Sequence, residues 1–158
     1  MRAPQTITIS GAGSCRTPAL IGTLMQMKER FPVKKVIFFD KDMKRFAKIE
    51  DYCRLLLHTF SPETEVVVTD DMDEAYCACD FVFCQMRVGQ NKMRSYDEKI
   101  PLKHGLVGQE TCGPGGFAYG MRSIGGMKEM VDCVRKYSKD TWILNYTNPA
   151  AIVGLALD

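Results

Sequence analysis

The sequence predicts an α/β fold with a mainly parallel sheet and helices on both of its faces. Short runs rich in β-branched and aromatic residues alternate with helical patterns along the 158 residues. The helical segments are long enough to return the chain from the end of one strand to the start of the next, as right-handed βαβ crossovers require. A glycine-rich turn follows the first β-rich run directly. These observations together predict a Rossmann-like domain.

The strands are predicted from short apolar runs that have the composition of buried strands. They cover residues 6–10, 36–40, 65–69, 81–86 and 142–146. In the first expected helix, Thr17 serves as the cap, Pro18 takes the first helical position, and apolar residues recur at helical steps up to Phe31. Further helices are expected over 46–60 and 124–134, and a short one within 71–79. Residues 105–116 are expected to form an irregular, functional loop because they contain five glycines and a proline.

Composition narrows the class of protein. With 46% hydrophobic and 25% charged residues, the chain has the composition of one globular domain over residues 1–158. The 21 basic and 19 acidic residues are too evenly balanced to indicate nucleic acid or an anionic membrane as a partner. Seven cysteines without a Cys-x-x-Cys pair are best explained as mostly buried residues in a reducing compartment. The longest apolar run, 150–157, is too short to cross a bilayer, so we expect a cytoplasmic protein.

The glycine-rich turn is a candidate phosphate-binding site. Gly11, Ala12, Gly13 and Ser14 lie between the first strand and the first helix. Gly11 permits the tight turn, and Gly13 lets the backbone approach a pyrophosphate, whose charge suits the positive end of the helix dipole. Position 16, where the usual fingerprint has a third glycine, holds Arg16. Its side chain either supplements the phosphate contact or is simply solvated.

Asp40 is the candidate residue for choosing the cofactor. It ends the second predicted strand, where a carboxylate accepts hydrogen bonds from both ribose hydroxyls and repels a 2′-phosphate. NAD is therefore favoured over NADP. The alternative is an ordinary strand-to-helix turn in which Asp40 caps a helix.

Several motifs in the middle of the chain resemble those of a known family. They are Arg87-Val88-Gly89, Met93-Arg94, the stretches 97–105 and 108–116, and the stretches 119–124 and 145–153. The chain is similar to family 4 of the glycoside hydrolases over essentially its whole length. Thr-Cys-Gly-Pro-Gly-Gly followed by Tyr-Gly-Met-Arg-Ser resembles the 6-phospho-α-glucosidase branch of that family.

The resemblance implies an activity and its cofactors. The family hydrolyses O-glycosidic bonds, here those of 6-phospho-α-glucosides such as maltose 6′-phosphate, and it needs NAD instead of the usual pair of carboxylates. The implied route is oxidation at C3, elimination at C1, addition of water and reduction. A divalent metal, typically Mn²⁺, polarises the C2 and C3 oxygens. The partner is thus a small phosphorylated disaccharide, and the full-length form is implied to be a homo-oligomer.

The resemblance also implies roles for three residues. Arg94 and Asn148 match substrate-binding residues, and Glu110 matches an acid that raises the basicity of a catalytic tyrosine outside this chain. Without the resemblance, Arg94 and Glu110 would be read as surface charges and Asn148 as a helix cap. His58, His104 and Cys112 have no partner at a catalytic spacing and are left out of the mechanism.

The resemblance places the metal ligands and the tyrosine base beyond Asp158, so no metal site is expected within this chain. The isolated chain is therefore expected to be inactive as a glycosidase. Two alternatives stay open: a non-catalytic NAD-binding fragment, and a fragment of an oxidoreductase like lactate or malate dehydrogenase.

Overall fold

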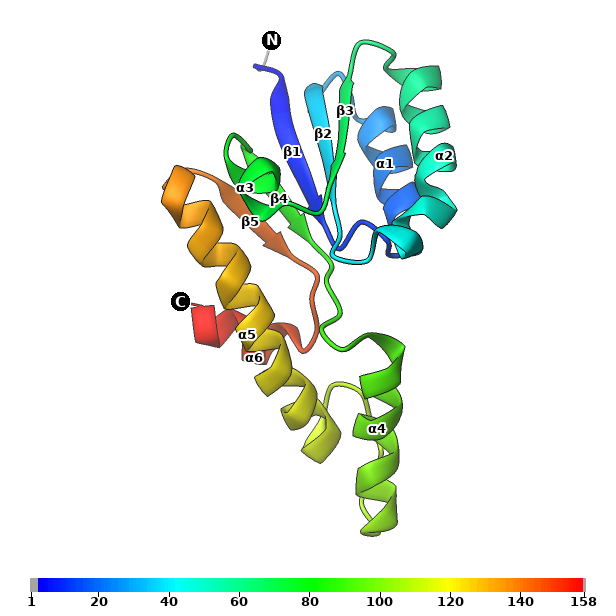
Figure 1. The fold of residues 1–158 in the computed structure, drawn as a ribbon, viewed down its shortest axis with the longest axis vertical. Coiled ribbons are helices and arrows are strands. Elements are labelled where there is room, and N and C mark those ends of the chain that lie inside the picture. The colour runs from blue at the N-terminus through cyan, green and yellow to red at the C-terminus, as the bar shows by residue number, and fades with distance from the viewer. Residues whose placement is uncertain (1–2, 158) are drawn as a thin grey trace. The chain divides into compact units, whose positions relative to one another are not determined.

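A computed structural model describes residues 3–157, which form a five-stranded sheet and six helices (Figure 1). The strand order is β3-β2-β1-β4-β5, and β1 pairs in parallel with β2 and β4, as β2 does with β3. The strands are β1 (Gln5–Ser10), β2 (Val33–Phe39), β3 (Glu65–Thr69), β4 (Phe81–Cys84) and β5 (Trp142–Asn145). The predicted Rossmann-like fold class is confirmed.

The helices include two that the sequence pattern did not predict. The observed helices are α1 (Thr17–Gln26), α2 (Met43–Phe60), α3 (Met72–Tyr76), α4 (Gln90–Lys103), α5 (Gly113–Tyr137) and α6 (Ala150–Leu157). No helix was expected where α4 lies, and a helix at the place of α6 was implied only by the alternative reading of Asn148 as a helix cap. None of the helices in the described part of the chain is long and apolar enough to cross a membrane.

The internal contacts divide the chain into two compact units. Within residues 3–157, the first unit comprises the part up to Gln85 and Cys133–Leu144, and the second comprises Met86–Asp132 and the part from Asn145 onward. The expectation of a single domain over residues 1–158 stays a prediction.

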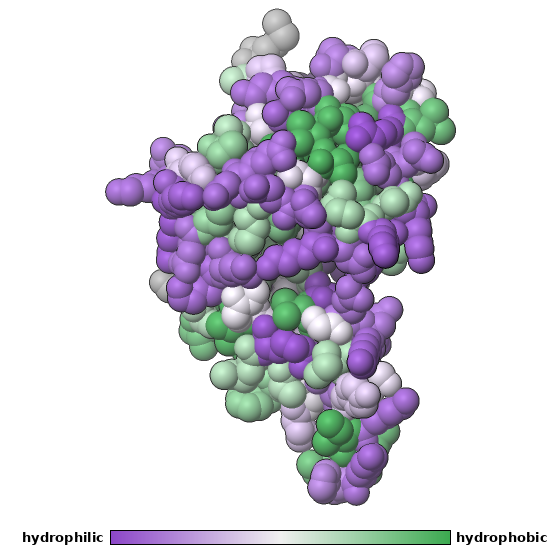
Figure 2. All heavy atoms as spheres, in the orientation of Figure 1, coloured by the Kyte–Doolittle hydropathy of each residue, from purple (hydrophilic) through white to green (hydrophobic). Residues whose placement is uncertain are grey.

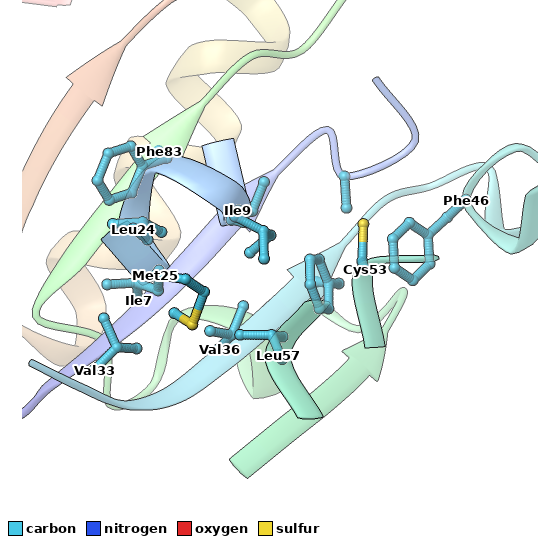
Figure 3. Packing of buried hydrophobic residues seen from close by; sticks show 13 residues of the cluster. Ile7, Ile9, Leu24, Met25, Val33, Val36, Phe46, Cys53, Leu57 and Phe83 are labelled. Atoms are coloured by element: carbon cyan, nitrogen blue, oxygen red, sulfur yellow. The ribbon is translucent and has the colours of Figure 1, made fainter. Parts of the chain in front are cut away.

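In the first unit, the sheet is covered by α1 and α2 on one face and by α3 on the other (Figure 1). Ile7 and Ile9 of β1, Val36 of β2, Met25 of α1 and Leu57 of α2 meet in the apolar core between the sheet and the first pair of helices (Figure 3). Burial on both faces explains why the strands of a parallel sheet are almost continuously apolar. The amphipathic patterns of α1 and α2 therefore position the carboxyl ends of β1 and β2.

The start of α1 differs from the prediction. Thr17 is the first helical residue rather than the cap, and Arg16 occupies the cap position without a side-chain hydrogen bond. The reason is that Thr17 Oγ1 donates to the carbonyl of Ala12, at 2.6 Å, and thereby ties the helix to the glycine-rich turn. Phe31 lies beyond the helix, and its ring packs edge-on against Phe81 of β4 with the centroids 5.1 Å apart.

The glycine-rich stretch is less irregular than expected, because α5 begins at Gly113. Three of its five glycines, Gly108, Gly115 and Gly116, lie against backbone atoms of the second unit. A Cβ at Gly108 would lie 2.1 Å from the carbonyl oxygen of Glu98, and one at Gly115 would lie 2.4 Å from that of Asp97. Glycine is required at these positions because only a residue without a side chain permits such close approach.

One expectation about surface and interior needs correction. None of the seven cysteines, all within the described residues, forms a disulfide, and only Cys53, Cys79 and Cys84 are buried, so most are not core residues. Large apolar side chains are exposed on the segments around α4 and the start of α5, which lie at the lower end of Figure 2. Examples are Ile100, Leu102, Val107 and Phe117, each more than half exposed.

Candidate functional site

The glycine-rich turn of the first unit follows β1 at the point where the strand order changes direction. The chain passes from β1 outward to β2 and β3 and then returns to place β4 on the other side of β1. Ligands of open α/β sheets bind at the carboxyl ends of the strands at such a switch point. Gln85, just after β4, donates its Nε2 to Thr17 Oγ1 at 2.7 Å, which joins the end of β4 to the start of α1.

The turn itself is held by backbone hydrogen bonds. Gly11 has φ of 83°, a left-handed conformation that favours glycine. The amides of Gly11 and Ala12 both donate to the carbonyl of Phe39, at 2.9 and 3.0 Å, so the end of β2 fixes the turn. A Cβ at Gly13 would lie 2.9 Å from Asp40 Oδ2 and 2.9 Å from Arg45 Cγ. Gly13 therefore cannot be replaced without displacing one of these side chains.

The amino end of α1 has the properties of an anion-binding helix terminus. No side chain caps it, and its first turn contains no acidic residue. The helix dipole is therefore directed at the turn with no acidic side chain in the first helical turn, while the amides of Thr17 and Leu20 donate to the carbonyls of Ser14 and Arg16. Arg16 is exposed at this end. These features fit the pyrophosphate of a dinucleotide.

Asp40 lies next to the turn, as the sequence predicted. Its Oδ2 accepts a hydrogen bond from the amide of Gly13 at 2.7 Å, and its Oδ1 accepts one from the amide of Asp42 at 2.9 Å. The alternative that Asp40 caps a helix is wrong, because Asp42 is the cap of α2 and accepts from the amide of Arg45. The Gly13 amide is therefore directed at Asp40.

The second unit contains a cluster of ion pairs around Glu110. Arg87 Nη2 donates to Glu110 Oε1, and Arg94 Nη2 lies 3.2 Å from Glu110 Oε2. Arg94 Nε also donates to Glu98 Oε1 at 2.7 Å. The hydrogen bond with Glu98, and then the charge of Glu110, raise the pKa of the Arg94 guanidinium above its usual value. Two of the predicted site residues, Arg94 and Glu110, are thus in direct contact.

A buried tyrosine lies beside this cluster. Tyr119 is 2% exposed, and the guanidinium carbons of Arg87 and Arg122 lie 5.3 and 5.5 Å from its ring centroid. Burial raises the pKa of Tyr119, and the positive charge of Arg87 opposes that rise. Arg122 forms a two-pronged ion pair with the buried Asp97. Alternating arginines and acids therefore fix this part of the unit.

Asn148 precedes α6 in the same unit. Its carbonyl accepts a hydrogen bond from Ser123 Oγ of α5 at 3.3 Å, and the side chain is half-buried. His58, His104 and Cys112 are exposed. Among residues 3–157, no three His, Cys, Asp or Glu side chains are grouped so that they could hold a metal ion.

Sequence reasoning missed four residues that the structure brings into these sites. Arg87, Tyr119 and Arg122 were quoted as parts of motifs but received no role, and Arg45 was not considered. Arg45 Nε donates to the carbonyl of Gly13 at 2.8 Å. The signal for Arg45 was its place in the first turn of the helix that follows Asp40.

The fold and the turn define a class: a Rossmann-like domain of the dinucleotide-binding type. A solved structure of malate dehydrogenase from Naegleria fowleri has this fold, with a TM-score of 0.67, 19% identity and coverage of 99% of this chain and 43% of that one. The model for the family described as "Family 4 glycosyl hydrolase" matches residues 6–158. The chain belongs to this family, as its motifs indicated.

Relatives in the family resemble the chain closely in sequence. It is 50% identical to 6-phospho-alpha-glucosidase 1 of Lacticaseibacillus paracasei and 49% identical to the maltose-6'-phosphate glucosidase of Bacillus subtilis, with 96% of this chain and 34% of each relative covered. It is 35% identical to the 6-phospho-beta-glucosidase of Escherichia coli, with 94% of this chain and 33% of the relative covered. The chain spans about a third of the length of these relatives.

A solved structure agrees with this assignment. The crystal structure of a 6-phospho-alpha-glucosidase from gut microorganisms in complex with NAD and Mn²⁺ has a TM-score of 0.94 and 43% identity, and 98% of this chain matches 36% of that one. The predicted resemblance to the 6-phospho-α-glucosidase branch is confirmed.

Proposed function

We propose that this chain supplies the NAD site and part of the substrate site of an enzyme that hydrolyses 6-phospho-α-glucosides, such as maltose 6′-phosphate, with a divalent metal. The observation that carries the proposal is the contact between Asp40 and the glycine-rich turn, at the carboxyl ends of β1 and β2. Support for the substrate class comes from the higher identity with the α-specific relatives than with the β-specific one.

The cofactor site is built from Gly11, Ala12, Gly13, Ser14 and Asp40. The turn and the uncapped amino end of α1 hold the pyrophosphate. The Asp40 carboxylate accepts hydrogen bonds from the ribose hydroxyls and excludes a 2′-phosphate by charge repulsion. Each carboxylate oxygen accepts more than one hydrogen bond, so its bonds with Gly13 and Asp42 leave capacity for the ribose. Bound NAD supplies reversible oxidation of a sugar carbon.

Arg94 and Asn148 hold the phosphorylated sugar. The Arg94 side chain is 44% exposed, so its guanidinium is accessible to an anionic substrate. That substrate has to compete with Glu98 and Glu110 for the same donors, which selects for a strong acceptor such as a phosphate. The Asn148 amide offers both a donor and an acceptor to sugar hydroxyls.

Glu110 serves the reaction by raising the basicity of a tyrosine outside residues 1–158. Arg87 positions the carboxylate through the ion pair that joins them. Ligands for Mn²⁺ are also proposed to lie outside the chain. A cytoplasmic location and a homo-oligomeric full-length form belong to the same proposal.

Calorimetric titration of the chain with NAD⁺ and NADP⁺ tests the cofactor part. We expect NAD⁺ to bind more tightly, and Asp40→Ala to weaken NAD⁺ by about 1–3 kcal/mol, as expected for a lost charged hydrogen bond. Arg54→Ala is the matched control, since Arg54 is a charged residue of α2 that pairs with Glu50 away from the turn. Equal or tighter binding of NADP⁺ by the unaltered chain would contradict the proposal.

The substrate part is tested in the full-length enzyme with a chromogenic α-glucoside 6-phosphate. Arg94→Ala should lower kcat/KM by about 2–3 kcal/mol in transition-state free energy while the affinity for NAD⁺ stays nearly unchanged. A normal kcat/KM, or a defect confined to NAD⁺ binding, would return Arg94 to the status of a surface charge.

A further inference from the structure

Arg45 shares its position beside the turn with Asp40. The backbone of Gly13 is held by hydrogen bonds on both sides. Its amide donates to Asp40 Oδ2 at 2.7 Å, and its carbonyl accepts from Arg45 Nε at 2.8 Å. The Arg45 stem and the Asp40 carboxylate also approach the same side of Gly13, each 2.9 Å from the place of a Cβ. A guanidinium and a carboxylate thus lie side by side at one residue of the turn.

Arg45 is fixed at this place by its helix. It lies in the first turn of α2, and its amide donates to the cap residue Asp42 at 3.1 Å. The side chain is half-buried, which limits the positions that the guanidinium can adopt. Other charges of the segment are Lys41, Asp42 and Lys44, so the basic groups near Asp40 outnumber its acidic neighbour.

We propose that Arg45 is a second specificity-determining residue of the cofactor site: it positions Gly13 for either dinucleotide and takes the 2′-phosphate of NADP⁺ when the Asp40 charge is removed. This inference rests on the proposed binding of NAD. In such sites an acid at the end of the second strand hydrogen-bonds the ribose 2′-hydroxyl, and an arginine near that hydroxyl accommodates a 2′-phosphate. In the natural chain the carboxylate repels that phosphate, so Arg45 acts only on the turn.

The proposal separates two effects of Arg45. Loss of its bond with Gly13 weakens both cofactors to the same extent, because the pyrophosphate meets the same turn in each. Loss of its charge beside the 2′-position affects only NADP⁺, and only when Asp40 no longer excludes the phosphate. The ratio of the two dissociation constants therefore reports specificity, whereas a purely structural role would leave this ratio unchanged.

The experiment is a double-mutant cycle on the 158-residue chain, with NAD⁺ and NADP⁺ titrated into the unaltered chain and into Asp40→Ser, Arg45→Gln and the double variant. Asp40→Ser should improve binding of NADP⁺ relative to NAD⁺ by about tenfold or more, the range of a charge-assisted hydrogen bond. Adding Arg45→Gln should abolish that gain, and Arg45→Lys should restore part of it. Arg45→Gln alone should weaken both cofactors equally. Arg54→Gln, which removes a paired arginine elsewhere on α2, should leave the ratio unchanged.

Circular dichroism confirms that each variant is folded, and Asp40→Asn, which keeps an acceptor for the Gly13 amide, replaces Asp40→Ser if that variant fails to fold. If NADP⁺ binds equally well with and without Arg45 in the Asp40→Ser background, the specificity role is overturned while the NAD site stands. If the unaltered chain binds neither cofactor, the proposed function fails and this inference fails with it.

Discussion

At the scale of single residues, the pair Asp97–Arg122 is the most deeply buried ion pair of the second unit described above. The Asp97 side chain is 5% exposed and that of Arg122 is 22% exposed. Removing one partner of a buried pair leaves the other charge desolvated without compensation. Asp97→Ala should therefore lower the free energy of unfolding by about 3 kcal/mol, the lower end of the range for buried pairs, because Arg122 keeps some access to water. Urea unfolding followed by circular dichroism measures the loss.

Helix α5, which contains Arg122, also provides a matched control. Lys128 and Asp132 form an ion pair on α5 with side chains 66% and 50% exposed. Asp132→Ala should change the free energy of unfolding by about 0.5 kcal/mol or less, since an exposed pair of this spacing contributes little. Similar losses for Asp97→Ala and Asp132→Ala would show that burial of the first pair has no energetic consequence.

Cys53 makes the stability of the first unit depend on alkaline pH. Burial, with a further contribution from Glu50, raises the pKa of the Cys53 thiol from 9.0 to about 11. The neutral thiol is favoured in the folded state, so its contribution is complete below pH 9 and is lost as the pH rises toward 11. At pH 10.5 the ionisation of the unfolded chain should cost the folded state about 2 kcal/mol relative to pH 7.

The comparison that isolates this effect is with Cys53→Ala, which lacks the ionisable group but retains the tyrosines and lysines that also titrate at high pH. Urea unfolding of both proteins at pH 7 and pH 10.5 should show that the natural chain loses more stability than the variant. Equal losses would assign the alkaline effect to other groups.

The sequence was informative at this scale where the interacting residues are close along the chain or follow strand ends. Gly11, Gly13 and Asp40 were predicted because strand, turn and acid occur in a fixed order. The pairs Arg87–Glu110 and Asp97–Arg122 join residues 23 and 25 positions apart, and nothing in the pattern says which arginine meets which acid. Arg94 and Glu110 entered only through the family resemblance.

At the scale of elements, the glycines of α5 allow a test of why the chain is glycine-rich there. A Cβ at Gly115 would lie 2.4 Å from the carbonyl oxygen of Asp97 and 2.7 Å from that of Gln109, and backbone atoms cannot move aside cheaply. Gly115→Ala should therefore destabilise the chain by about 1–3 kcal/mol, as overpacking does. Thermal or urea unfolding measures the change.

Gly125 is the control within the same helix, because a Cβ there would have nothing within 4 Å. Gly125→Ala should stabilise the chain by about 0.5–1 kcal/mol, since alanine loses less backbone entropy in a helix. Opposite signs for the two substitutions are the expected result. A stabilising Gly115→Ala would mean that the close approach to Asp97 is absent in solution.

The boundaries of α4 and α5 were not predictable from periodicity. Gly113, Pro114, Gly115 and Gly116 have the composition of a loop. Yet proline suits the first turn of a helix, Gly113 has a positive φ, and Gly115 and Gly116 are needed for close approach to backbone atoms. The polar sequence of α4 gives little amphipathic signal, and Pro101 lies inside it. By contrast, the strands and α2 were predicted within a few residues, because their apolar patterns face one core.

At the scale of the whole chain, every residue of the proposed cofactor turn, together with Asp40 and Arg45, belongs to the first compact unit. A ligand that binds only the folded state stabilises that state by an amount set by its concentration and dissociation constant. NAD⁺ at about one hundred times its dissociation constant should therefore stabilise the first unit by about 2.7 kcal/mol. Hydrogen exchange should therefore slow at the amides that exchange only when this unit unfolds.

Hydrogen exchange followed by mass spectrometry measures this effect segment by segment. We expect exchange in β1, β2 and α2 to slow by up to about 100-fold with NAD⁺, the factor that corresponds to 2.7 kcal/mol, whereas α4 should be protected less. Asp40→Ala at the same concentration of NAD⁺ is the control, and its protection should fall as its affinity does. Equal protection in both units would instead indicate that they unfold together, in agreement with the prediction of a single domain. Protection of α4 without protection of β1 and β2 would contradict a cofactor site at Gly11–Ser14, since binding there must stabilise the unit that contains the turn.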